Sequence, residues 1–130
     1  LMLQALLQHG CFELMVRGSS MMPTLLQGDS VHLERLDTTP QLNDVVLVVD
    51  NGVFALHRVV GVRLAGDQRQ FLLKGDAQPK ADGWFERHAL RAVATQATTS
   101  HQESFAIGRR PLSMWERWQC RRSRRRRRLH

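Results

Sequence analysis

The sequence has few of the residues and segments that mark membrane-spanning or secreted proteins. Aromatic residues make up only 6% of the chain, and tyrosine is absent. Uncharged apolar stretches stay short, as at Val45–Val49, whereas a membrane-spanning helix needs about 20 apolar residues. The first residues, Leu1 to Leu7, lack the basic flank and the small-residue cleavage site of a secretory signal. We therefore expect neither a spanning helix nor a signal peptide in this chain.

Cysteine is also scarce, and its placement indicates a reducing compartment. Cys11 and Cys120 form no CxxC pair and no disulfide framework. Such cysteines are typical of ordinary thiols in the cytoplasm, where disulfides are rare. The six histidines show no metal-ligand spacing with each other or with the cysteines. We therefore expect a cytoplasmic protein with no metal and no cofactor.

The net charge of +7 is distributed very unevenly along the 130 residues. Residues 1–108 hold nine Lys and Arg against eleven Asp and Glu, a net charge of −2. Residues 109–130 hold ten Arg against one Glu, a net charge of +9. This division predicts one small domain over 1–108 followed by a basic segment over 109–130. A nucleic-acid-binding fold is not expected, because the body of the chain is mildly acidic.

The alternation of apolar and polar residues predicts a body made mostly of short strands and tight turns. The Asp50-Asn51-Gly52 turn between two β-branched runs is a strong hairpin signal, since Asn and Gly accept positive φ. Gln78–Gly83 is expected to be a polar loop. The expected strands are Phe12–Val16, Ser30–Arg35, Asp44–Val49, Val53–Val62, Phe71–Lys74 and Leu90–Thr95.

Two helices are expected at the ends of this β body. Apolar spacing predicts a short helix over Met2–Gln8, ended by Gly10. A second helix is expected from Pro111, with Leu112, Trp115 and Trp118 on one face, followed by a disordered run at Arg121–Arg128. Three roles stay open for residues 111–128: tryptophans capping the β body ahead of a solubilising tail, peripheral contact with an anionic membrane, or contact with an acidic partner.

The stretch from Gly18 to Gly28 is where chemistry is most expected. Its glycines, serines and Pro23 exclude a regular element, so Ser20 lies on a loop that can expose a hydroxyl. A serine hydroxyl needs a base, and His57 lies in an otherwise apolar strand that would fix an imidazole. An acid must then orient that imidazole, and Asp76 and Asp82 follow the next strand.

Each of these signals also has an ordinary structural interpretation. Serine in a Gly- and Pro-containing loop is usually a turn residue, and a lone histidine in an apolar strand is usually a half-buried core residue. Gly-Asp pairs are common in turns, as at Gly28-Asp29 and Gly66-Asp67. It is the order and spacing of the signals along the chain that favours catalysis.

These spacings resemble the motifs of type I signal peptidases over roughly residues 12 to 95. The string Val16-x-Gly18-x-Ser20-Met21-x-Pro23-Thr24-Leu25-x-x-Gly28-Asp29 is similar to the nucleophile box of that family. Asp44-Val45-Val46 resembles a strand start of the family, with Asn43 in place of its glycine. His57-Arg58-Val59 and Lys74-Gly75-Asp76-Ala77, followed by Asp82, resemble the endoplasmic-reticulum and archaeal branch, which uses serine and histidine.

The resemblance implies a small LexA/signal peptidase-like β fold and a role for each matched residue. Ser20 would be the nucleophile, His57 the general base, Asp82 the likelier triad acid, and Asp76 a support for the loop or the histidine. The Ser20 amide would donate to the oxyanion. Gly18 stands where some members carry a hydroxyl donor. The residues that would shape the substrate and oxyanion loop are Gly18, Ser19, Met21 and Pro23.

The expected function is therefore a serine endopeptidase that cleaves a precursor or leader peptide without a membrane-spanning segment. Lys74 is not expected to be the base, because its place belongs to the later box. Two other functions stay open. The first is a catalytically inactive module that binds peptides or partners, and the second is a self-cleaving regulator. The SOS-repressor autopeptidases resemble it less, since they use a lysine base and cleave a segment ahead of the nucleophile.

Overall fold

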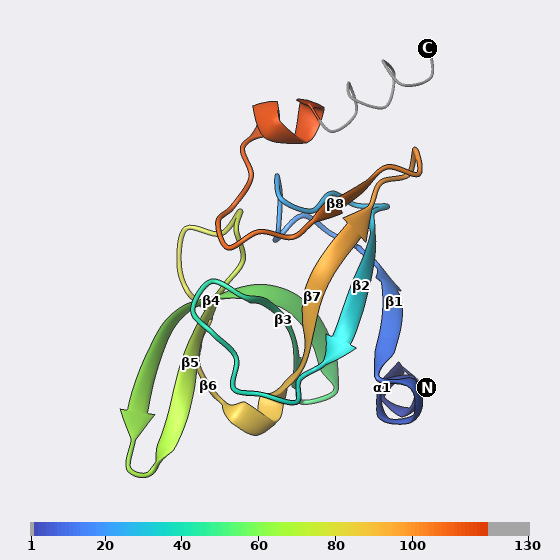
Figure 1. Ribbon diagram of the computed structural model, residues 1–130. Helices are drawn as coiled ribbons and strands as arrows, with labels where there is room; N and C mark the ends of the chain where they lie inside the picture. Colours follow the sequence, from blue (N-terminus) through green and yellow to red (C-terminus); the bar gives the residue numbers. More distant parts are fainter. Residues whose placement is uncertain (1, 120–130) are drawn as a thin grey trace.

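The protein is a curled antiparallel sheet with a short helix near each end of the described chain, seen here in a computed structural model that describes residues 2–119 (Figure 1). The mainly β architecture expected from the sequence is confirmed. The predicted disordered run at Arg121–Arg128 lies outside the described residues, as does Cys120. In chain order the elements are α1 (Met2–His9), β1 (Cys11–Met15), β2 (Ser30–Arg35), β3 (Val45–Asp50), β4 (Val53–Ala65), β5 (Gln68–Lys74), β6 (Gly83–Glu86), the 3₁₀ turn η1 (Arg87–Ala89), β7 (Leu90–Thr98) and β8 (Ser104–Ala106).

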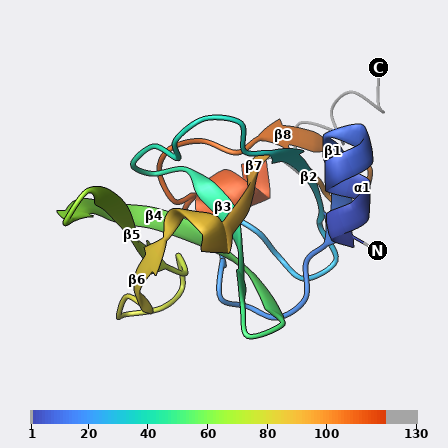
Figure 2. The ribbon, with the colours of Figure 1, turned by 90° about the horizontal axis from the view of Figure 1, so that it is seen from below.

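The strands form one sheet in the order β1-β2-β7-β3-β4-β5-β6, and β8 pairs with β7 beside this path. All neighbouring strands run antiparallel. The β4–β5 hairpin extends away from the rest of the sheet, while α1 lies beside β1 at the opposite edge (Figures 1 and 2). β1 is thus an edge strand, a position that matters for the site described below.

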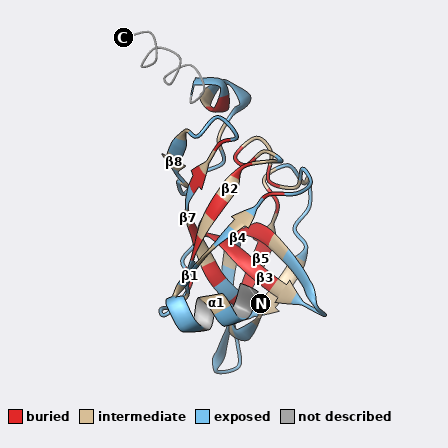
Figure 3. Cartoon of the chain, turned by 90° about the vertical axis from the view of Figure 1, so that its right-hand side faces the viewer, coloured by how far each residue is buried: buried red, intermediate tan, exposed pale blue. Residues whose placement is uncertain are grey.

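The core lies on both sides of β3, which explains the uninterrupted apolar run at Val45–Val48. Side chains of a strand alternate between its two faces. Val45 and Leu47 pack into one cluster with residues of β2, β7 and the loop after β1, whereas Val46 and Val48 pack into a second cluster with β5. Figure 3 shows the buried residues concentrated along these central strands. A strand buried on both faces reads as a continuous hydrophobic segment.

The predicted β3–β4 hairpin is confirmed in detail. Asn51 and Gly52 have φ values of 51° and 77°, as a turn of this type requires. Val46 lies opposite His57 in the register, and Val45 lies opposite Arg58. The turn chemistry and the two apolar runs together therefore position the candidate base, His57, in the middle of the sheet.

Two strands were not expected from the sequence. β6 begins at Gly83, the last residue of the expected loop, and pairs with β5. β8 pairs with Ala97 and its neighbours in β7. Both strands are only three or four residues long, so neither is long enough to show an alternating pattern, and tertiary pairing alone makes them strands.

The C-terminal helix over residues 114–119 differs from the expected one in where it begins and which face it buries. It starts at a capping box, in which the Glu116 amide donates to Ser113 Oγ (3.1 Å) and the Ser113 amide donates to Glu116 Oε1 (3.2 Å). Pro111 lies before this cap. Of the three roles left open for this segment, the structure does not have the one in which the tryptophans cap the β body: Trp115 and Trp118 are exposed and stack on each other. Arg117 is buried instead.

Within residues 2–119, no helix is both long enough and apolar enough to cross a bilayer. Specific contacts join residues 109–119 to the expected 1–108 domain. The Leu112 amide donates to Thr24 Oγ1 (2.9 Å), and Nη2 of Arg117 donates to the carboxylate oxygens of Asp29 (3.0 and 2.9 Å).

The capping box leads to a prediction on the acidity of Glu116. Hydrogen bonds from Arg110, followed by the backbone amide of Ser113, lower the pKa of this carboxyl from 4.5 to about 2. Because the pKa is lowered on folding, the stabilisation by the charged carboxylate is present above the ordinary value and is lost as pH falls through about 2. We expect the NMR shift of the Glu116 carboxyl carbon to titrate near pH 2. In Arg110→Ala the titration midpoint of Glu116 should move toward 4.5. Equal midpoints in the wild type and in Arg110→Ala would show that Arg110 does not lower the pKa of Glu116.

Candidate active site

The loop that carries Ser20 leaves the sheet after β1 and returns to it at β2. Its two ends are tied together, since the Val16 amide donates to the carbonyl oxygen of Asp29 (2.8 Å) and the Gly28 amide donates to that of Val16 (3.0 Å). Between these ends the Leu25 amide donates to the carbonyl oxygen of Met21 (2.9 Å), which forms one helical turn. Met21 and Leu25 are buried in the core. Half-buried Ser20 is therefore held on an anchored loop.

A second loop, over residues 75–82, lies directly against the Ser20 segment. The Ala77 amide donates to the carbonyl oxygen of Ser20 (2.9 Å), and the Asp76 amide donates to Met21 Sδ (3.4 Å). A Cβ atom on Gly75 would lie 2.5 Å from the carbonyl oxygen of Ser20. Only glycine permits this approach, which explains the glycine in Lys74-Gly75-Asp76.

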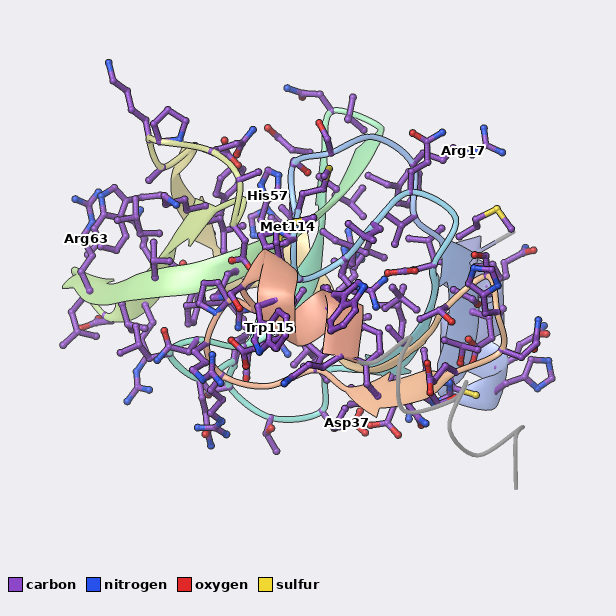
Figure 4. All side chains as sticks on the ribbon, turned by 90° about the horizontal axis from the view of Figure 1, so that it is seen from above. Arg17, Asp37, His57, Arg63, Met114 and Trp115 are labelled. Atoms are coloured by element: carbon purple, nitrogen blue, oxygen red, sulfur yellow. The ribbon has the colours of Figure 1, made fainter. Side chains whose placement is uncertain are left out.

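The same loop carries the carboxylate that contacts His57. Asp82 forms an ion-pair contact with Nδ1 of His57, and its amide donates to the carbonyl oxygen of Leu73 (2.7 Å). Nδ1 is buried and has no hydrogen-bond partner within residues 2–119, so the ion-pair contact with Asp82 is the interaction that engages it there. Figure 4 shows His57 near the middle of the molecule in that view, between Arg63 on the β4–β5 hairpin and Arg17. A carboxylate at Nδ1 fixes the imidazole and leaves Nε2 as the nitrogen that can exchange a proton.

Asp76, the other candidate acid, is engaged elsewhere. Its carboxylate accepts from Nε and Nη2 of Arg58 (both 2.9 Å) and from Thr24 Oγ1 (2.5 Å). The Arg58 and Asp76 side chains are each only 2% exposed. Arg58 Nη1 also donates to the carbonyl oxygens of Asn43 and Gly108 (both 2.8 Å). Of the two expected roles for Asp76, the structure therefore places it in support of the loop, with Asp82 on the histidine.

The remaining predicted site residues lie along the Ser20 loop. Gly18 has φ of 81°, a conformation that favours glycine, and Ser19 is exposed. Pro23 follows a cis peptide bond. Lys74, which was not expected to be the base, donates to the neighbouring carbonyl oxygen of Gly75 (3.3 Å).

An apolar groove of about 440 Å³ runs from Ser20 along the edge strand β1. The exposed Phe54, near the tip of the β3–β4 hairpin, faces it from the other side with Leu56. An edge strand beside such a groove offers unpaired backbone groups to an extended peptide. The other lining residues are Phe12, Glu13, Leu14, Met15, Val16, Arg17, Gly18, Met21 and Leu25.

Sequence reasoning missed two buried ion pairs that hold this region together. Arg58 was noticed only as part of a motif, although an arginine in an apolar strand needs a buried carboxylate. Asp29 was interpreted as a turn residue, but both of its carboxylate oxygens accept from Nη2 of Arg117 (3.0 and 2.9 Å). The buried position of Arg58 was a usable signal, whereas the pairing of residues 29 and 117 had none.

The chain matches no known family model, and no curated protein is significantly similar to it. The function of this site is therefore inferred from its residues and the distances between them.

Proposed function

We propose that the protein is a serine endopeptidase in which Ser20 is the nucleophile, His57 the general base and Asp82 the acid that orients the base. This assignment extends the resemblance of its motifs to the serine–histidine branch of the type I signal peptidases. Asp76 is a positioning residue that secures the loop between the two halves of the site. The substrate we infer is a leader or precursor peptide.

The observation that carries the proposal is the double attachment of the 75–82 loop. One part of the loop is bonded to the backbone of Ser20 through Ala77, and its end holds His57 through Asp82. Residues 20, 57 and 82 are far apart in the chain, yet the 75–82 loop contacts both the backbone of Ser20 and the side chain of His57. A paired imidazole and carboxylate on a loop that contacts a groove-lining serine supports a functional site.

The reaction follows from the roles of these groups. Nε2 of His57 takes the Ser20 hydroxyl proton as Oγ attacks the carbonyl carbon of the scissile bond, and the carbonyl oxygen becomes an oxyanion. When this tetrahedral intermediate collapses, the C–N bond breaks and the imidazolium gives its proton to the leaving amine. A water then attacks the acyl-enzyme with His57 again accepting the proton, which releases the carboxylic acid and restores Ser20.

The groove supports a peptide substrate in an extended conformation. Its lining is mainly apolar and it begins at Ser20, so a bound chain along β1 would bring one of its carbonyl groups to the nucleophile. Cys11 is a free and exposed thiol, which supports action in a reducing compartment. We therefore propose that cleavage takes place in the cytoplasm.

The variant Asp82→Asn tests the role of the acid. We expect kcat for peptides cleaved by the wild type to fall by roughly 10²- to 10⁴-fold, because an amide at this place favours the wrong imidazole tautomer. KM should change little, since Asp82 does not line the groove. Substrates are found by incubating the full chain with a proteome-derived peptide library and identifying new termini by mass spectrometry.

The matched control is Asp67→Asn, a change of the same chemistry in the exposed β4–β5 turn. It should leave kcat and KM unchanged. Wild-type kcat in Asp82→Asn, or an equal loss in both variants, would remove Asp82 from the mechanism. If the wild-type protein cuts no peptide in the library yet retains some of them, it is a binding module.

A further inference from the structure

The helix over residues 114–119 has the opposite burial pattern to an ordinary surface helix. It buries its arginine, Arg117, and exposes its large apolar side chains. Met114 is 61% exposed, Trp115 58% and Trp118 46%. A soluble surface helix normally turns apolar residues toward the core and charged residues toward water. Clustered exposed apolar residues of this kind mark an interaction surface.

This orientation is held by specific contacts. Nη2 of Arg117 donates to both carboxylate oxygens of Asp29, and both side chains are almost fully buried. The Arg117 guanidinium also lies over the ring of Phe105, 4.8 Å from its centroid. Rotating the helix to bury the tryptophans would break the pair and leave Asp29 as a buried, unpaired charge, which is strongly unfavourable. The exposed face is therefore a fixed part of the fold.

The sequence next to this face is strongly basic. The last 22 residues contain ten arginines and one glutamate; Arg117 is paired with Asp29 and Arg110 with Glu116, which leaves eight further arginines in this segment of the sequence. Tryptophan and methionine beside clustered arginine is the composition of a segment that inserts its rings at the headgroup level of an anionic bilayer. A bilayer fits better than nucleic acid, because its interface can bury the apolar Met114 side chain together with the tryptophans, whereas nucleic-acid binding depends mainly on phosphate contacts.

We propose that the face formed by Met114, Trp115 and Trp118 docks on an anionic lipid surface, with the neighbouring arginines binding the headgroups. In Figure 1 the helix stands at the end of the molecule toward which the 75–82 loop also extends. Figure 4 looks down on this end and shows Met114 and Trp115 on the helix nearest the viewer. Docking in this way brings the candidate active site toward the membrane surface. The lipid interaction does not depend on peptidase activity.

Vesicle co-sedimentation of the full chain tests the proposal. The vesicles are phosphatidylcholine alone, or phosphatidylcholine and phosphatidylglycerol in equal parts. We expect strong partitioning onto the anionic vesicles only. The double variant Trp115→Ala/Trp118→Ala should reduce the partition coefficient by roughly tenfold or more, because it removes the apolar area that enters the interface. Tryptophan fluorescence of the wild type should be quenched by brominated lipid.

The control is Leu64→Ser, which removes a side chain that is 71% exposed on the β4–β5 hairpin. It should partition like the wild type, and all three proteins should unfold at the same temperature because the changed side chains are exposed. If the double variant binds anionic vesicles as well as the wild type, the arginines act alone and the docking face is wrong. Binding to single-stranded RNA that is stronger than binding to vesicles would likewise overturn the proposal in favour of a nucleic-acid partner.

Discussion

Replacing Ser20 by alanine should lower kcat/KM for peptide cleavage by at least about a thousandfold, because no other group can form the acyl-enzyme. The fold should survive, since Ser20 is half-buried and its structural contact is made by its backbone carbonyl oxygen. We expect the free energy of unfolding to change by no more than about 0.5 kcal/mol. Cleavage is measured on peptides selected from the library, and stability by denaturant unfolding.

A serine outside the proposed site provides the control. Ser100 is exposed in the turn between β7 and β8, and Ser100→Ala likewise removes one serine hydroxyl. This variant should retain most of the wild-type kcat/KM. Equal rates for wild type and Ser20→Ala would exclude the nucleophile, and with it the proposed peptidase. In cells that carry Ser20→Ala, uncut precursors identified by mass spectrometry would then name the substrate.

The second large effect is expected on stability, from the buried pair of Arg58 and Asp76. Arg58→Met keeps the side-chain volume but leaves the Asp76 carboxylate buried without its cation. It also removes the hydrogen-bond donor of the carbonyl oxygens of Asn43 and Gly108. Breaking a buried ion pair by removing one partner costs about 3–5 kcal/mol. Denaturant unfolding should therefore show a much lower midpoint than the wild type.

The matched control for this change is Arg69→Met, which removes an exposed arginine from β5. It should cost no more than about 0.5 kcal/mol. The double variant Arg58→Met/Asp76→Asn should recover part of the stability lost in Arg58→Met, because the unpaired charge is gone. Equal unfolding midpoints for Arg58→Met and Arg69→Met would show that the pair does not stabilise the fold.

Local signals in the sequence were sufficient for most of the β body. Asn51-Gly52 determined a hairpin because two adjacent residues had to accept positive φ, and the structure has both values. β2 was predicted with the same limits, Ser30–Arg35, because its apolar and polar residues alternate cleanly. Short strands that form only by pairing with another strand were harder to predict from the sequence. β6 and β8 exist only because β5 and β7 offer free edges to pair with.

The sequence indicated the residues of the candidate site, whose catalytic roles stay predictions, but not the pairings between them. The order of serine, histidine and two aspartates pointed to one loop, yet sequence spacing could not say which carboxylate faces the histidine. Asp76 pairs with Arg58, the residue that follows His57 in β4, whereas Asp82 pairs with His57 itself. The burial of Arg117 was missed for a similar reason: spacing placed the two tryptophans on one helical face without showing whether that face is buried, and the partner of Arg117 is the distant Asp29.

The double attachment of the 75–82 loop restricts how this protein can be altered. One part of the loop is attached to the carbonyl oxygen of Ser20 through the Ala77 amide, and its end is attached to His57 through Asp82, so an inserted or deleted residue would shift these two candidate groups relative to each other. Phe54 has no such restriction, since it lines the groove and is exposed, whereas Phe12 and Leu14 also pack against the core residues that anchor the Ser20 loop. Engineering of peptide selectivity should therefore begin with Phe54 and leave the loop length unchanged.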